Sequence, residues 1–104
     1  MEVLMLEKAK LELLKFDKAV ITKFNFDFKE LQEKGKLDDT RFKKLRGHDL
    51  YELRVKYSGS IFRGICGYIK SGLLMVLFFQ KKTQKTPIRF IEVADKRYKN
   101  FKDN

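Results

Sequence analysis

Cysteine, histidine and proline each occur once in this 104-residue chain, and tryptophan is missing. The lone Cys66 excludes an internal disulfide and is compatible with a reducing cytoplasm, and its apolar surroundings predict a small core residue. With one histidine and no cluster of cysteine or acidic residues, the sequence predicts no metal site, and we expect no cofactor. A Ser–His–Asp order, a P-loop and a glycine-rich dinucleotide turn are also missing, which excludes the chemistries that depend on them.

Long apolar runs are scarce as well. The longest, Leu73–Phe79, is far shorter than the roughly 20 residues that cross a bilayer. The first residues carry Glu2, Glu7 and Lys8 around a short apolar patch and lack the layout of a signal peptide. No repeat or low-complexity stretch is present. We therefore expect one cytoplasmic domain, residues 1–104, with no membrane partner.

Positive charge is what the chain has in excess, with a net charge of +10 at pH 7. Residues 1–40 hold 8 basic and 9 acidic side chains, a net charge of −1, whereas residues 41–104 hold 16 basic and 5 acidic ones, a net charge of +11. An imbalance that follows a segment boundary indicates a polyanionic partner, nucleic acid above all. The alternative is a basic, soluble surface without such a partner.

The first part of the chain predicts a short strand followed by two helices. Val3–Leu6 is the candidate strand, and Glu7–Leu14 alternates charged with apolar residues at helical spacing. A second helix is predicted between an N-cap at Asp17 and a stop at Gly35, because apolar residues recur there every three or four positions. The period-two pattern at Phe24–Phe28 leaves a strand as the alternative.

The second part predicts a three-stranded antiparallel meander. Gly35–Asp49 is expected to be a polar connection. The strands are expected at Tyr51–Tyr57, Ile61–Ile69 and Leu73–Gln80, with Ser58-Gly59 and Ser71-Gly72 as turns. Loops this short require antiparallel neighbours. The fold class is therefore α+β.

A cationic turn precedes the last predicted helix. Three lysines follow the apolar strand: Lys81, Lys82 and Lys85. Thr86-Pro87 predicts the start of a helix, and this helix is expected to run from Pro87 to about Phe101. Its expected buried face consists of Ile88, Ile91, Ala94, Tyr98 and Phe101. Helix N-termini favour anions through their free N–H groups and dipole. The turn therefore predicts a phosphate-handling site.

The expected strand register brings charged residues together. With two-residue turns, Tyr57 pairs with Ser60 and Arg54 faces Arg63; Lys70 then pairs with Leu73, which puts Arg63 opposite Gln80. Like charges opposite each other destabilise a sheet unless an acid or a bound anion offsets them. The row Arg54–Arg63–Gln80 is therefore interpreted as a bidentate phosphate clamp. The alternative is a surface ion network in which Glu52 offsets the two arginines.

At these residues the chain resembles the RelE/ParE superfamily of toxins, and specifically a HigB-like, phage-type member of a type II toxin–antitoxin system. The pattern is carried by Lys44–Arg54, Ile61–Arg63, Phe79–Pro87 and Ile91–Arg97. The resemblance implies a RelE-like fold, in which a small antiparallel sheet (a three-stranded meander plus a short N-terminal strand) packs with two N-terminal helices and a C-terminal helix. It also implies a ribosome-dependent mRNA endonuclease held inactive by an antitoxin, in this branch a helix-turn-helix (HigA-like) protein.

The resemblance implies that basic residues act on the RNA. Arg54 and Arg63 are expected to clamp the scissile phosphate, and Lys81 or Lys82 to stabilise charge or transfer protons. The expected RNA-binding residues are Lys56, Gln80, Lys85, Arg89, Lys43, Lys44 and Arg46. Where some relatives carry a catalytic tyrosine, this chain offers Phe90, and Tyr98 cannot be assigned to that position. His48 lies in a Gly-His-Asp loop, where a solvated or capping role is favoured over a general base.

Cleavage of this kind uses the RNA's own 2′-hydroxyl to attack the adjacent phosphate, leaving a 2′,3′-cyclic phosphate. It needs positioning, proton transfer and charge stabilisation, but no metal or protein nucleophile. Two rival functions stay open. One is a gyrase poison, because fold alone does not decide chemistry. The other is a non-catalytic RNA-binding module, although most aromatic residues are expected in the core rather than exposed for stacking.

Overall fold

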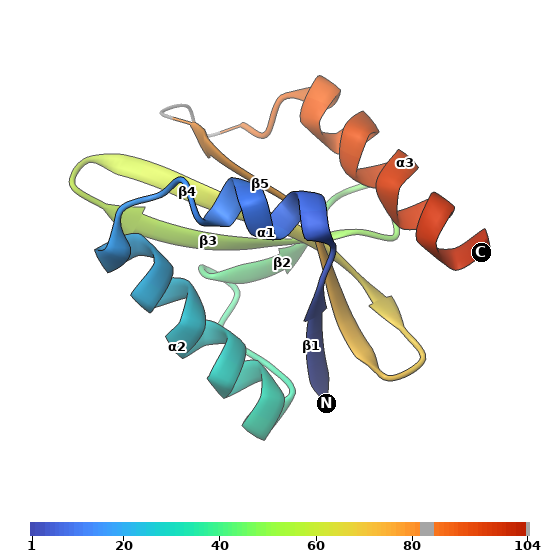
Figure 1. Ribbon diagram of the computed structural model, residues 1–104, viewed down its shortest axis with the longest axis horizontal. Helices are drawn as coiled ribbons and strands as arrows, with labels where there is room; N and C mark the ends of the chain where they lie inside the picture. Colours follow the sequence, from blue (N-terminus) through green and yellow to red (C-terminus); the bar gives the residue numbers. More distant parts are fainter. Residues whose placement is uncertain (82–84, 104) are drawn as a thin grey trace.

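The computed structural model describes residues 1–81 and 85–103, which form three helices and one five-stranded sheet (Figure 1). In chain order the elements are β1 (Glu2–Met5), α1 (Glu7–Leu13), α2 (Lys18–Lys34), β2 (Phe42–Lys44), β3 (Tyr51–Tyr57), β4 (Ser60–Ile69), β5 (Gly72–Lys81) and α3 (Ile88–Asp103). The strands lie in the order β1-β5-β4-β3-β2. The α+β class and the helix over Phe24–Phe28 are confirmed.

Two features of the sheet differ from the sequence prediction. A fifth strand, β2, pairs antiparallel with β3 inside the expected polar connection. It was missed because only Phe42 of its three residues is apolar, so no period can be seen. β1 pairs parallel with β5, so the sheet is mixed rather than antiparallel. Gly72 permits this pairing, since a Cβ there would lie 2.0 Å from the Glu2 carbonyl oxygen.

Helices cover both faces of the sheet. α1 and α2 bury one face in a core that contains Phe24, Leu53 and Phe78. α3 covers the other face, where Ile65, Phe79 and Tyr98 are buried together, and Figure 1 shows α3 apart from α1 and α2. The alternation of Glu52, Arg54 and Lys56 with apolar residues predicts one polar face for β3. Part of that face is nevertheless out of the solvent, since Glu52 is buried there.

The turn between β3 and β4 has the predicted register, with Tyr57 opposite Ser60 and Arg54 opposite Arg63. The next turn does not. Its loop is Lys70-Ser71 rather than Ser71-Gly72, and the β4–β5 register shifts between Ile65 and Cys66. Arg63 therefore lies opposite Phe79, and the predicted pairing with Gln80 is wrong.

α3 begins at Ile88, one residue later than predicted, and buries a narrower face. Ala94 and Tyr98 are buried, but Ile88 is 74% exposed and Phe101 is also exposed. The sheet therefore reaches only the middle of the helix. There the Tyr98 hydroxyl donates a hydrogen bond to the Tyr68 carbonyl, so this tyrosine has a structural role.

The edge of β5 beyond β1 is closed by an ion pair between α1 and α3. Glu12 accepts a hydrogen bond from the Phe78 amide at 3.1 Å and pairs with Arg97 at 3.0 Å. Arg97 also donates to the Val76 carbonyl. Because unpaired strand edges invite further pairing, these two side chains protect the edge and fix both helices against it.

Gly67 should be required where α3 meets β4. A Cβ at this position would lie 2.4 Å from the Tyr98 ring, so Gly67→Ala must displace this buried ring. We expect a loss of about 1–3 kcal/mol in the free energy of unfolding, measured by urea denaturation. In a Tyr98→Ala background the same substitution should cost much less, because the ring is gone. An equal cost in both backgrounds would contradict this account.

Candidate functional site

The strand pairing gathers cations on the α3 face of the sheet. Residues directly opposite each other in an antiparallel pair share a face. Arg54 and Arg63 form one row, and Lys56 and Lys81 lie at either side of Ile61 in the next. Lys43 of β2 pairs with Glu52 and joins the same face. Five of the basic residues predicted from sequence therefore lie on one face of the sheet.

Glu52 is the centre of this group. Its carboxylate is almost fully buried, with one oxygen 3.5 Å from Arg54 Nε and 3.6 Å from Arg63 Nε. The other oxygen accepts a short hydrogen bond from the Thr86 hydroxyl. Thr86 lies just before α3, so Glu52 connects two sheet arginines to the segment that leads into that helix. The network expected as the alternative is present, but it is buried rather than on the surface.

The two arginines differ in access. The Arg54 side chain is 18% exposed, whereas that of Arg63 is fully buried. Burial lowers the pKa of Arg63 from its usual value, and the charge of Glu52 opposes that shift. Arg54 can reach a ligand in this conformation. Arg63 cannot, so the expectation that both guanidinium groups grip one phosphate is corrected for Arg63.

The cationic turn is described in part. Lys81 is partly buried and Lys85 is exposed, while Lys82 lies outside the described residues. Arg89 lies over the Phe90 ring at 5.0 Å, and Phe90 stacks on Phe79 at 4.2 Å. This stack covers the sheet next to Arg63, which Phe79 faces. Phe90 therefore has a packing role where some relatives were expected to carry a tyrosine.

The remaining predicted residues lie elsewhere. Gln80 points to the opposite sheet face, where its amide donates to the Ser60 hydroxyl. Lys44 pairs with Tyr51 and faces away from Lys43. Arg46 and His48 lie in the turn between β2 and β3. Cys66 is buried, which raises the pKa of its thiol, as expected for a core residue.

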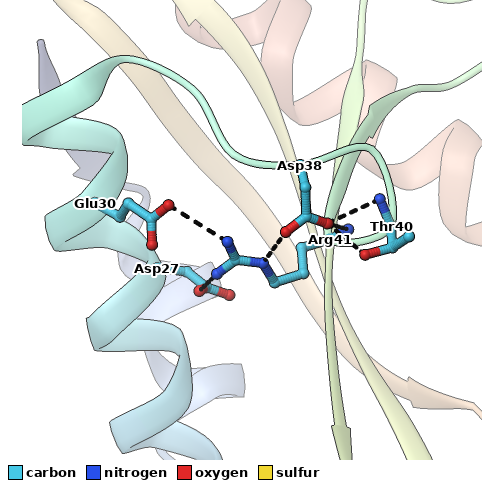
Figure 2. Close-up of polar contacts among 5 residues, drawn as sticks. All are labelled: Asp27, Glu30, Asp38, Thr40 and Arg41. Carbon is cyan, nitrogen blue, oxygen red and sulfur yellow. Dashed lines mark hydrogen bonds and ion pairs between the residues drawn. The ribbon is translucent and has the colours of Figure 1, made fainter.

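A second charged cluster, missed by sequence reasoning, ties α2 to the start of β2. Arg41 donates to Asp27 at 2.9 Å, to Glu30 at 3.3 Å and to Asp38 at 2.7 Å (Figure 2). Its carbonyl accepts a hydrogen bond from the Arg54 amide at 2.7 Å, which connects the cluster to β3. Asp27 is buried on α2. In the sequence it lies next to Phe28 of the apolar helix pattern, and a carboxylate buried there needs a cationic partner. That position was the one sequence signal for this cluster.

A cavity of about 430 Å³ opens between this cluster and β3. Its lining consists of Lys23, Phe26, Asp27, Thr40, Arg41, Arg54, Val55 and Lys56. Arg54 thus belongs to the cationic face and to this cavity.

The described residues offer neither a metal site nor a membrane span. Within residues 1–81 and 85–103, no group of three or more His, Cys, Asp or Glu side chains is placed to hold a metal ion. No helix in the described part of the chain is both long and apolar enough to cross a membrane.

The fold defined above is that of the RelE toxins. Residues 11–99 match the family model "Phage derived protein Gp49-like (DUF891)", and the chain belongs to this family. Doubly substituted E. coli toxin RelE in the free state superposes with a TM-score of 0.63 at 19% identity, covering 95% of each chain. The intact E. coli RelBE toxin–antitoxin complex gives a TM-score of 0.60 at 21% identity, covering 81% of this chain and 98% of that one. No curated protein sequence matches significantly.

Loss of the Glu52 charge should destabilise the protein. Glu52→Gln leaves the buried Arg63 cation without its carboxylate, and breaking a buried pair in this way costs about 3 kcal/mol. The measurement is the urea midpoint, with Glu92→Gln on the exposed side of α3 as the matched control. Equal stability of the two variants would show that Glu52 does not balance the buried arginine.

The Arg41 cluster predicts opposite pKa shifts for two carboxyls. Hydrogen bonds from Thr40 and then Arg41 lower the pKa of Asp38 to about 2, whereas burial raises that of Asp27 above 3.8 despite Arg41. Arg41→Gln should raise both pKa values, and Thr40→Ala only that of Asp38. Carboxyl carbon shifts in an NMR titration measure both.

The two pKa shifts make the free energy of unfolding depend on pH in opposite directions. The stability that Asp38 contributes is present above pH 3.8 and is lost as the pH falls towards 2. Asp27 has the opposite effect, because its pKa is raised in the folded state. The stability that it contributes is present at low pH and is lost as the pH rises through its folded-state pKa. A Thr40→Ala variant that shifts both carboxyls equally would contradict the separate causes.

Proposed function

We propose that this protein is the toxin of a type II toxin–antitoxin system and that it cleaves mRNA on the ribosome. One observation carries the proposal: Arg54 is accessible on the same sheet face as Lys56 and Lys81 in a RelE-like fold, with its guanidinium next to the buried Glu52. Membership of the Gp49-like family supports it. The cytoplasm, where ribosomes work, is the proposed location.

The proposed partner is an antitoxin. The RelBE complex is a toxin–antitoxin complex with the same toxin fold, which supports a partner of this kind here. A helix-turn-helix, HigA-like antitoxin is proposed from the sequence resemblance. The net charge of +10 favours an acidic partner surface and an RNA substrate alike.

In the proposed reaction the 2′-oxygen of the RNA attacks the adjacent phosphorus and the bond to the 5′-oxygen breaks. The products are a 2′,3′-cyclic phosphate and a 5′-hydroxyl end. The 2′-hydroxyl loses its proton and the leaving 5′-oxygen gains one. Lys81 or Lys82 is proposed to transfer protons or to stabilise the charge, and the route requires no metal or cofactor.

The residues of the cationic face take different roles in this proposal. Arg54 binds the scissile phosphate, because its guanidinium offers a fork of donors to two oxygens. Arg63 is a positioning residue, since it is buried and contacts Glu52, which also contacts Arg54. The lysines at 43, 56 and 85 and Arg89 are proposed to hold flanking phosphates.

Arg54→Ala tests the proposal most directly. Removing a group that stabilises charge at the reacting phosphate should lower the rate of mRNA cleavage on ribosomes by about 100-fold or more. Arg54→Lys should recover part of the activity, because the charge returns without the fork. Lys10→Ala, on the exposed surface of α1, is the control and should cut like the unchanged protein.

The readout is the mapping of mRNA ends in cells that express the protein alone, combined with identification of the cyclic phosphate. Intact mRNA together with raised DNA-damage signalling would favour a gyrase poison. Growth without arrest, with RNA bound but uncut, would favour a binding module. Full activity of Arg54→Ala would overturn the assignment of Arg54.

A further inference from the structure

The cavity beside Arg54 lies where the sheet edge becomes uncovered. β2 pairs with β3 only from Tyr51 to Leu53, and the Arg41 carbonyl takes the next amide, that of Arg54. Beyond this point, Val55 and Lys56 of β3 line the cavity, and α2 forms its opposite wall. Its volume of about 430 Å³ is within the range of roughly 300–1,000 Å³ typical of ligand pockets.

Phe26 is the unusual residue of this wall. Its neighbours Phe24 and Phe28 are buried in the core, but Phe26 is 70% exposed. It shares a helix side with Lys23, three residues earlier, and both line the cavity. An aromatic ring open to solvent beside a lysine is the combination on which single-stranded RNA-binding proteins stack bases.

The charge offered to a ligand is positive. Arg41 is already matched by three carboxylates, so its charge belongs to the structure. The cations left for a ligand are Lys23 and Lys56, which form no ion pair within the described residues, and Arg54. An apolar planar face with cations at its rim is complementary to a nucleotide, whose base is flat and whose phosphates are anionic.

We propose that this cavity binds one nucleobase of the RNA, stacked on Phe26, next to the phosphate that Arg54 holds. The identification of the ligand as RNA rests on the proposed function. Arg54 reaches both the cationic face and the cavity, so the base bound there adjoins the bond that is cut. Lys23 and Lys56 would contact the phosphates on either side of this base.

The test measures binding without cleavage. The probe is a short single-stranded RNA in which every 2′-hydroxyl is methylated, so that the 2′-oxygen cannot attack, with one 2-aminopurine as a fluorescent base. Phe26→Leu should weaken binding by about 5- to 100-fold and abolish the quenching of the 2-aminopurine. Phe26→Tyr should bind within about threefold of the unchanged protein, because the aromatic face is kept.

Two controls separate stacking from other effects. The salt dependence of binding should be the same for Phe26→Leu and the unchanged protein, because no phosphate contact is lost. Phe101→Leu removes an exposed ring from α3 and should change nothing. Thermal unfolding checks that Phe26→Leu stays folded, as expected for a residue so exposed.

Each outcome bears on one of the two proposals. Cleavage by the unchanged protein together with Phe26-independent RNA binding overturns the base site and leaves the nuclease. Phe26-dependent binding without any cleavage overturns the nuclease and leaves the base site. A Phe26→Leu variant that loses affinity only for the antitoxin would assign the cavity to that partner instead. An unchanged protein that neither binds this RNA nor cleaves mRNA on ribosomes overturns both.

Discussion

The arrangement of the site depends on one buried carboxylate. Glu52 lies within 3.6 Å of both sheet arginines and accepts the Thr86 hydrogen bond. Two arginines opposite each other repel, and a fully buried guanidinium such as that of Arg63 loses its hydration. Glu52 offsets both costs, because its carboxylate is buried beside both guanidinium groups. The same side chain binds Thr86 just before α3, so the start of that helix and the sheet arginines share one anchor.

The register of the first hairpin could be predicted because its two-residue turn and its alternating pattern agree, and Arg54 faces Arg63 as expected. The second hairpin could not, because both strands are apolar on nearly every residue. A continuous apolar run has no period that marks its faces, so the shift at Ile65/Cys66 leaves no trace in sequence. That shift moved Gln80 to the other face. β2 was missed for a related reason, since three residues are too few to show alternation.

The candidate site could be predicted to the extent that its residues carry charge. Arg54, Lys56 and Lys81 were found because cations near a strand end are visible in sequence. The burial of Glu52 was not visible, since it depends on tertiary contacts with Arg63 and with Thr86, which lies far along the chain. The cavity at Phe26 was missed for the same reason: its walls come from α2, β3 and the loop before β2, which only the tertiary fold brings together. Sequence reasoning expected the aromatic residues in the core, and Phe26 is the exception.

Net charge alone overstates how many cations are offered to a ligand. Arg41 is paired with three acids, Arg97 with Glu12, and Arg63 lies buried next to Glu52, so these three arginines serve the structure. The cations that can meet a polyanion are mainly lysines, together with Arg46, Arg54 and Arg89. Lysine binds phosphate as a mobile point charge, whereas arginine fixes its geometry. Arg54 is held by the buried Glu52, so it would fix the position of a single phosphate. The surrounding lysines would bind the neighbouring phosphates with less defined geometry. This division suits a substrate that another body, such as the ribosome, holds in place.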